Sequence, residues 1–142
     1  MSQAKNYLTI YVDGASRGNP GPAGVGIALE DDKGITKAKV SRYIGETTNN
    51  QAEYKALIMG LEEAVKLKAE HVNIRTDSKL LVEQIQGNYK VRNANLRVLF
   101  RQVKQLLAGF KSFTIARIPR QQNMIADALA NKALDKLKQT GL

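Results

Sequence analysis

Four acidic residues lie at the ends of predicted strands or within apolar patterns, where a charged side chain needs a physical explanation. Asp13 and Asp77 each end a short segment with the pattern of a strand. Glu53 lies on the apolar stripe of a helical pattern, and Asp127 interrupts the apolar segment 125–130. An unpaired carboxylate in apolar surroundings costs several kcal/mol, so it is protonated, meets a cation or binds a metal ion. We therefore expect these four acids to converge on one site.

A divalent metal ion is the partner that best explains such a group of acids. Carboxylates brought together repel one another and raise one another's pKa values, and a hard cation removes that repulsion. Oxygen ligands suit Mg²⁺ or Mn²⁺, whereas the absence of Cys and the single His argue against zinc. Two such ions roughly 3.5–4 Å apart can activate a water molecule and stabilise the leaving oxygen of a phosphodiester. The candidate catalytic residues and metal ligands are Asp13, Glu53, Asp77 and Asp127.

The first half of the chain predicts three strands and a helix around these acids. Apolar residues alternate with polar ones from residue 8 to 12, which predicts a strand that ends at Asp13. Residues 14–22 are dense in turn formers and predict a loop. Two further strands are predicted at 23–29 and 35–44, joined by a hairpin turn at 31–34. The first three strands are therefore expected to be antiparallel.

A helix is predicted from the Thr47–Thr48 pair, either of which can be its N-cap, to about Ala69. Leu57, Leu61 and other small or apolar residues recur at spacings of three and four residues. Glu53 lies one turn earlier on that same stripe, so its carboxylate faces the core.

The second half predicts elements that complete a mixed sheet. We expect a strand over 71–77, a helix over 79–85 capped by Ser78, and a helix around 96–107 with a basic outer face. A fifth strand is predicted at 112–118, and a last helix begins near Asn123. This order predicts an α/β sheet with helices on both faces, whose fourth strand runs parallel to an earlier one. Ligands gather beyond the carboxyl ends of such strands, where Asp13 and Asp77 are expected.

Length, composition and charge narrow the class of protein. The 142 residues, 43% of them hydrophobic, predict one domain over residues 1–142 with a single core. The lack of Cys fits a reducing compartment, and the sequence shows neither a signal-peptide core nor an apolar run of about 20 residues, so we expect a cytoplasmic protein without a membrane partner. The net charge of +9 favours a polyanionic partner, with nucleic acid ahead of an anionic membrane surface.

Four segments together resemble the type 1 ribonuclease H family. They are Asp13–Pro22, Thr48–Glu53, Thr76–Ser78 and Asn123–Asp127, and they appear in that family's order over a stretch from about residue 8 to 137. Each segment alone is a weak signal, whereas four in order are a strong one. The resemblance implies one ribonuclease H domain with a five-stranded mixed sheet, three antiparallel strands then two parallel, flanked by helices on both faces.

The resemblance also implies an activity and a substrate. It implies a metal-dependent endoribonuclease that hydrolyses the RNA strand of RNA–DNA hybrids, with two Mg²⁺ or Mn²⁺ ions expected in the presence of substrate. The products would carry 3′-hydroxyl and 5′-phosphate ends, and contacts to the hybrid would read the RNA 2′-hydroxyl. Carried over by position, the substrate-binding candidates are Gly14, Asn19, Thr48, Asn49, Asn50, Ser78, Arg120 and Asn123.

This chain departs from the family pattern in three respects. Many members carry a His in the loop before the last acid, but here the loop 119–123 has none, and Arg120 stands in a similar place. An arginine stays protonated, so it can stabilise charge without acting as a base. The chain also lacks a Trp-rich basic handle and a separate hybrid-binding domain, and no obligatory protein partner is evident. Grip on the hybrid is therefore expected from Lys90, Arg92, Arg97 and Arg101, with a steep dependence on salt.

Two other functions fit part of the sequence. The first is a weakly catalytic module that binds hybrids or double strands, which an Asp77→Asn variant distinguishes from an enzyme. The second is another nuclease of the same fold, such as an exonuclease or a DNA strand-transfer enzyme. The segments Gly18–Gly21 and Thr48–Asn50 disfavour the second. Each acid alone also has a structural explanation, since Asp commonly makes a turn after a strand and Glu53 suits the positive end of a helix dipole.

Overall fold

A computed structural model describes the backbone of residues 6–139 and the side chains of residues 6–137. The predicted limits of the domain, residues 1 and 142, lie outside these residues. Within the described part, no helix is both long enough and apolar enough to cross a bilayer.

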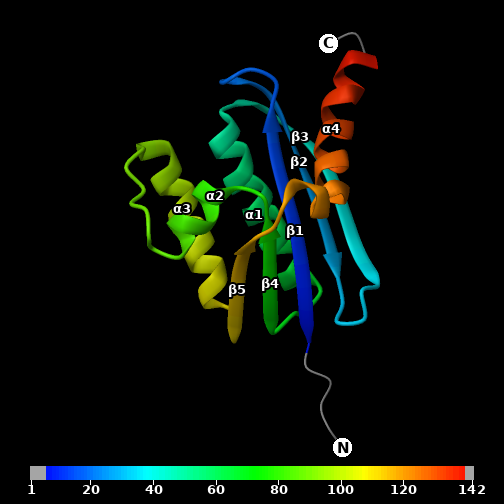
Figure 1. The fold of residues 1–142 in the computed structure, drawn as a ribbon, viewed down its shortest axis with the longest axis vertical. Coiled ribbons are helices and arrows are strands. Elements are labelled where there is room, and N and C mark those ends of the chain that lie inside the picture. Colours follow the sequence, from blue (N-terminus) through cyan, green and yellow to red (C-terminus); the bar gives the residue numbers. More distant parts are fainter. Residues whose placement is uncertain (1–5, 140–142) are drawn as a thin grey trace, which may run out of the picture.

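The protein folds around one five-stranded mixed sheet with the strand order β3-β2-β1-β4-β5 (Figure 1). β1 pairs antiparallel with β2, which pairs antiparallel with β3, while β4 runs parallel to both β1 and β5. The predicted fold class is therefore confirmed. The strands are β1 (Tyr7–Ser16), β2 (Gly21–Glu30), β3 (Thr36–Thr47), β4 (His71–Thr76) and β5 (Ser112–Arg117). The helices are α1 (Asn49–Lys66), α2 (Lys79–Ile85), α3 (Ala94–Ala108), a short 3-10 turn η1 (Arg120–Gln122) and α4 (Met124–Gln139).

Helices cover the two faces of the sheet unequally. α1 packs on β1 and β2 and contacts α3, so the main core lies on this face. α4 packs on the opposite face, against β2, β3 and β1 (Figure 1). Alternate residues of β1, from Leu8 to Val12, are buried against the α1 side, as the period-2 pattern predicts.

The helix that carries Glu53 begins as the sequence predicts. Thr48 is the N-cap, and its hydroxyl accepts a hydrogen bond from the Gln51 N–H while the Gln51 side chain accepts one from the Thr48 N–H. This reciprocal arrangement satisfies two amides that the first turn would leave without partners. Leu57 and Leu61 are fully buried on the stripe that includes Glu53. The helix ends at Lys66, three residues before the predicted end.

The predicted loop over 14–22 is wrong at both ends. Gly14–Ser16 continue β1, and β2 already begins at Gly21, because Gly14 pairs with Val25 and Ser16 with Ala23. Only residues 17–20 form the connection, so Asp13 lies inside a strand and not at its end. The parallel pairing of β1 with β4 nevertheless stops at Tyr11 and Arg75. Asp13 therefore lies beyond the part of β1 that pairs with β4.

The other predicted elements differ only at their ends. β3 runs on to Thr47, three residues beyond its predicted end, and α4 starts at Met124, next to the predicted Asn123. The hairpin turn at 31–34 is confirmed, with the Gly34 N–H donating to the Asp31 carbonyl at 3.0 Å. Ser78 caps α2 as predicted, and its hydroxyl accepts from the Leu81 N–H at 3.2 Å.

Candidate active site

Three of the four predicted acids form a single cluster. Asp13 from β1, Glu53 from α1 and Asp77 just after β4 each place a carboxylate oxygen within 4.8 Å of the other two. Asp13 is 7% exposed and Glu53 is 6% exposed, whereas Asp77 is half-buried. Three carboxylates, two of them buried, therefore lie together, whereas the sequence predicted that all four acids would converge.

Gly14 lets α1 approach β1 closely enough for Glu53 to reach the cluster. Its N–H donates to Glu53 Oε1 at 2.7 Å and fixes the orientation of that carboxylate. A Cβ atom at position 14 would lie 2.2 Å from the carbonyl carbon of Ala52, so only glycine fits between strand and helix. The Gly14 N–H is thus engaged inside the protein.

Burial and neighbouring carboxylates disfavour the charged forms of Asp13 and Glu53. Burial, helped by the nearby Glu53 and Asp77 carboxylates, raises the pKa of Asp13 from 3.8 to about 9. Burial also raises the pKa of Glu53 from 4.5 to about 7, although the hydrogen bond from Gly14 works in the opposite direction. Without a cation, the pair therefore retains protons that ordinary carboxylates release.

Asp127 lies in the first turn of α4 beside this cluster but outside the group of three. Its carboxylate interacts with Asp13 and contributes to the raised pKa of that residue. Asp127 Oδ1 also lies 3.4 Å from Nη2 of Arg120, in the turn that precedes the helix. The fourth acid is thus close to the site, where the Arg120 guanidinium partly offsets its negative charge.

Asn123 connects α4 to the strand that carries Asp13. Its Nδ2 donates to the carbonyl of Val12 at 2.9 Å, and its side chain is only 1% exposed. The sequence predicted a substrate contact for Asn123; its Nδ2 is engaged inside the protein, whereas its Oδ1 has no hydrogen-bond partner among the described residues.

Two glycines that the sequence analysis did not single out place α4 on the sheet. A Cβ at Gly26 would lie 1.9 Å from the Ala126 carbonyl oxygen, and one at Gly24 would lie 2.7 Å from that of Ala130. The helix backbone therefore rests directly on β2, which sets the position of Asp127. Glycines at alternate positions of a strand mark a close backbone approach, and this signal was present in the sequence.

The candidate substrate residues on the first connection and on α1 lie side by side. Asn19 Oδ1 accepts from the Asn49 N–H at 3.0 Å, which ties the connection between β1 and β2 to the start of α1. Asn19, Asn49 and Asn50 are exposed, and Thr48 is half-buried because its hydroxyl caps the helix. The exposed amides of these three residues thus form one polar surface on the turn of α1 that precedes Glu53.

The remaining candidates divide into a cap and a set of exposed cations. Ser78 is half-buried and caps α2 immediately after Asp77.

A second surface lies around the connection between α2 and α3, where a pocket of about 460 Å³ is lined by aromatic, aliphatic and basic side chains. The predicted hybrid-gripping cations Lys90, Arg92, Arg97 and Arg101 are all exposed there.

The donor set fits a hard divalent cation. Every side chain of the cluster offers carboxylate oxygen, and the described residues bring no His or Cys into the group of three. Cations of this kind prefer oxygen ligands and would neutralise the charges that raise the pKa values of Asp13 and Glu53. The site is therefore suited to bind a metal ion of the Mg²⁺ class.

Comparison with known proteins gives a consistent match over most of the chain. The family described as reverse transcriptase-like matches residues 11–133, a segment that contains all four acids. Ribonuclease HI of Halobacterium salinarum is 46% identical over 125 residues, which are 88% of this chain and 63% of that protein. The bifunctional protein Rv2228c of Mycobacterium tuberculosis is 43% identical over 134 residues, which are 94% of this chain and 37% of that protein. The chain thus spans less than two thirds of the length of either relative.

Solved structures agree with the sequence matches. The crystal structure of RNase H1 from Halobacterium salinarum has a TM-score of 0.90 at 44% identity and covers 92% of this chain and 98% of its own. LC11-RNase H1, solved in complex with an RNA/DNA hybrid, has a TM-score of 0.86 at 43% identity and covers 91% of this chain and 97% of its own. The fold is therefore similar to that of these ribonuclease H structures.

Proposed function

This chain belongs to the type 1 ribonuclease H family, and on that premise we propose that it is a metal-dependent endoribonuclease acting on the RNA strand of RNA–DNA hybrids. The observation that carries the proposal is the convergence of Asp13, Glu53 and Asp77 within 4.8 Å. Ribonuclease H relatives at 43–46% identity support the substrate class, and one of them was solved with a hybrid bound.

The four acids are proposed to hold two Mg²⁺ or Mn²⁺ ions when the hybrid is bound. Such ions polarise a scissile phosphodiester and lower the pKa of water, which allows hydrolysis at neutral pH and yields 3′-hydroxyl and 5′-phosphate ends. Asp13, Glu53 and Asp77 would hold these ions, and Asp127 would add a further carboxylate from α4. The Gly14 N–H keeps the Glu53 carboxylate turned toward the site, as its 2.7 Å hydrogen bond indicates.

Recognition of the hybrid is proposed to lie beside the acids. The exposed amides of Asn19, Asn49 and Asn50 can donate to and accept from RNA 2′-hydroxyls, which is the group that distinguishes RNA from DNA. Thr48 and Ser78 act by capping the helices that begin at the site. Asn123 acts by positioning, since its buried amide holds the turn before Asp127 against β1.

Arg120 is proposed to act through charge. Its guanidinium lies 3.4 Å from the Asp127 carboxylate, and its side chain is 73% exposed, so it can also reach an incoming phosphate. Because arginine does not lose its proton near neutral pH, Arg120 stabilises negative charge and does not serve as a general base.

The test is product mapping on internally labelled substrates. The protein with Mg²⁺ or Mn²⁺ should cleave the RNA strand of a hybrid at internal positions and leave duplex DNA and duplex RNA intact. EDTA should abolish cleavage, and Asp77→Asn should lower it by several orders of magnitude. Asp32→Asn removes an exposed carboxylate in the hairpin turn and is the matched control, which should retain full activity.

Three results would contradict the proposal. Unchanged metal-dependent cleavage by Asp77→Asn would show that the acid cluster is not the catalytic site. Binding of the hybrid without cleavage under any metal would identify a binding module. Release of single nucleotides from an end would identify an exonuclease.

A further inference from the structure

Part of the sheet on the α4 side carries no helix. α4 covers β2, β3 and the upper part of β1, while β4, β5 and the first half of β1 are open to the front in Figure 1. Residues that alternate with the buried core residues point to this side. We call this surface the open sheet face, and its members are Tyr7, Thr9, Tyr11, His71, Asn73, Arg75, Ser112 and Thr114.

The residues of the open sheet face are aromatic and polar and are held in rows across the strands. Tyr7 stacks on His71 with ring centroids 4.5 Å apart, and His71 Nδ1 shares a 2.6 Å hydrogen bond with Ser112 Oγ. In the next row Thr114 Oγ1 donates to Asn73 Oδ1 at 2.9 Å. A sheet face exposed to water is usually polar, and the rings of Tyr7, Tyr11 and His71 add flat surfaces on which a base can stack.

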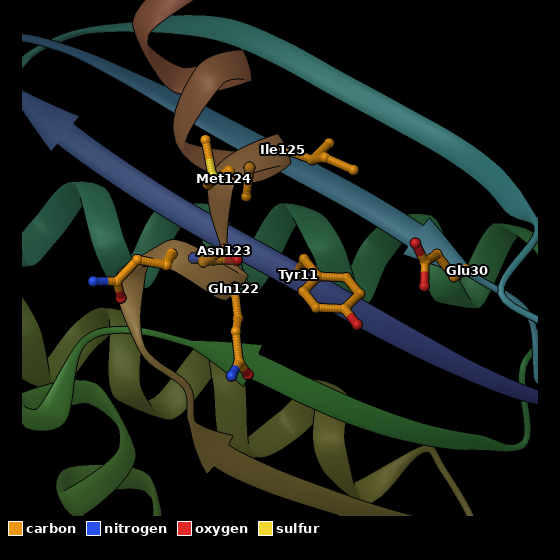
Figure 2. A pocket seen from close by; sticks show the side chains of 8 residues that line it. Tyr11, Glu30, Gln122, Asn123, Met124 and Ile125 are labelled. Atoms are coloured by element: carbon orange, nitrogen blue, oxygen red, sulfur yellow. The ribbon is translucent and has the colours of Figure 1, made fainter.

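A pocket of about 250 Å³ lies at the upper end of this face, where η1 crosses the sheet (Figure 2). The Tyr11 ring stands on β1 below it, and the Gln122 side chain hangs from η1 over β4. Two large apolar side chains of α4 form its outer rim, Met124 at 66% exposed and Ile125 at 49% exposed. The pocket therefore combines an aromatic surface, an amide and an apolar rim.

One polar atom beside the pocket lacks a partner. Oδ1 of the buried Asn123 accepts no hydrogen bond from any described residue, and this end of the side chain lies on the Tyr11 side in Figure 2. A buried acceptor without a donor is costly, so a ligand that carries an N–H or amino group would lower the energy of the site. Exocyclic amino groups of nucleobases are donors of this kind.

The open sheet face also leads directly to the catalytic acids. Tyr11 lies two residues before Asp13 on the same side of β1, and Arg75 lies two residues before Asp77, so each pair is separated by about 7 Å along its strand. Arg75 is half-buried on the face, and Arg120 is exposed on η1 at its upper end. Positive charge is thus gathered where a polyanionic strand would leave the acids, which is the charge complementarity that a nucleic acid requires.

From these observations we propose that the open sheet face binds a single-stranded stretch of RNA or DNA that adjoins the hybrid, with one unpaired base stacked on Tyr11 in the pocket below Met124 and Ile125. This inference rests on the proposed function, because it needs a hybrid at the acid cluster. Stacking on aromatic rings tolerates any base, and the arginines hold the phosphates. The enzyme would then favour junctions between hybrid and single strand over blunt hybrids.

The experiment compares the binding of four ligands by fluorescence anisotropy in EDTA, where no cleavage occurs. The ligands are a blunt hybrid, the same hybrid with a short single-stranded RNA extension, the same hybrid with a DNA extension, and the free extension strands. Wild-type protein should bind at least one extended hybrid about tenfold more tightly than the blunt one, since a stacked base is worth a factor of that order. The RNA and DNA arms identify which strand is taken.

Three variants separate stacking from damage to the fold. Tyr11→Leu should abolish the preference for the extension and leave the affinity for the blunt hybrid unchanged, whereas Tyr11→Phe, which keeps the ring, should retain the preference. Tyr43→Leu removes another half-exposed tyrosine, on β3, and should behave as wild type. Thermal melts establish that each variant is folded.

Two results would overturn the inference. One is equal affinity of wild-type protein for blunt and extended hybrids. The other is a Tyr11→Leu variant that weakens blunt and extended hybrids by the same factor. Cleavage of the blunt hybrid by wild-type protein, assayed with Mg²⁺ on the same stocks, shows whether the proposed function itself holds.

Discussion

At the scale of single residues, the buried acids of the cluster lower the stability of the metal-free protein. Asp13 and Glu53 are almost fully buried, and burial raises the pKa of both carboxyl groups. In the unfolded chain both groups ionise near pH 4, so from there upward the metal-free folded state holds more protons than the unfolded state. Stability of the metal-free protein must then fall as the pH rises, until Glu53 ionises at about pH 7 and Asp13 at about pH 9.

This fall in stability with rising pH leads to a prediction for Asp13→Asn. The variant removes the group with the larger shift, so at pH 8 in EDTA it should be more stable than wild type by at least about 1 kcal/mol. Its stability should also change less between pH 5 and pH 8. Urea unfolding at several pH values measures both effects. Saturating Mg²⁺ should reverse the order, because only wild type retains the full ligand set; a variant that is less stable than wild type in EDTA at pH 8 contradicts the prediction.

Arg120 competes with metal ions for Asp127. The two side chains lie 3.4 Å apart and are 73% and 29% exposed, so the ion pair is worth at most about 1 kcal/mol. Arg120→Ala should therefore raise the affinity for Mn²⁺ about two- to fivefold, as measured by calorimetry without substrate. Arg42→Ala removes an exposed arginine of β3 and is the control for net charge. An equal rise in both variants would mean that overall charge, and not the pairing with Asp127, sets the affinity.

At the scale of elements, the position of α4 depends on glycines in β2. The backbone of α4 lies so close to Gly26 that an added Cβ would be 1.9 Å from the Ala126 carbonyl oxygen and 2.5 Å from the Ala130 nitrogen. Backbone atoms cannot move aside as a flexible side chain can. Any side chain at position 26 must therefore push the helix, and Asp127 with it, away from the sheet.

Gly26→Ala tests this placement. We expect a loss of about 2–4 kcal/mol in the free energy of unfolding, because the substitution overpacks a contact between backbones. Cleavage should fall more than stability alone explains, since Asp127 shifts while Asp13, Glu53 and Asp77 keep their positions. Gly109→Ala is the control: its nearest neighbour would be 3.4 Å away, and its φ of −80° suits alanine. Wild-type cleavage by folded Gly26→Ala would show that the site tolerates displacement of α4.

The elements also show how far the sequence determines the fold and the site. Periodicity located the Glu53 helix and the strands because these patterns are local. The approach of Asp13 to Asp77 was predicted from strand ends, although Asp13 lies inside β1. The sequence does not show which strands pair with one another. Gly14–Ser16 are rich in turn formers and were therefore assigned to a loop, although they pair with β2. The pairing of Arg120 with Asp127 depended on the η1 turn, whose geometry no pattern specified.

At the scale of the whole molecule, charge is unevenly distributed. The net charge is +9, with 22 basic and 13 acidic residues, yet three of the acids are concentrated in the cluster. Exposed cations lie around the connection between α2 and α3, beside the pocket of about 460 Å³. A polyanion is thus attracted by the surface at large, while the acid cluster forms one negatively charged point on it.

This distribution predicts that hybrid binding weakens steeply as the salt concentration rises, and that removing basic side chains reduces this slope. Each phosphate neutralised by a basic side chain contributes a slope of about 0.9 to the fall of log K with log salt. If Arg97 and Arg101 each hold a phosphate, the double variant Arg97→Ala/Arg101→Ala should reduce the slope by about 2 and weaken binding most at low salt. Anisotropy titrations in EDTA from about 50 to about 300 mM KCl, a range that includes physiological ionic strength, measure the slope. Lys33→Ala/Lys37→Ala removes two exposed cations near the hairpin turn, on the far side of the sheet, and should leave the slope unchanged. Equal changes in both double variants would assign the effect to net charge, whereas a change confined to the α3 pair would place the hybrid across this surface.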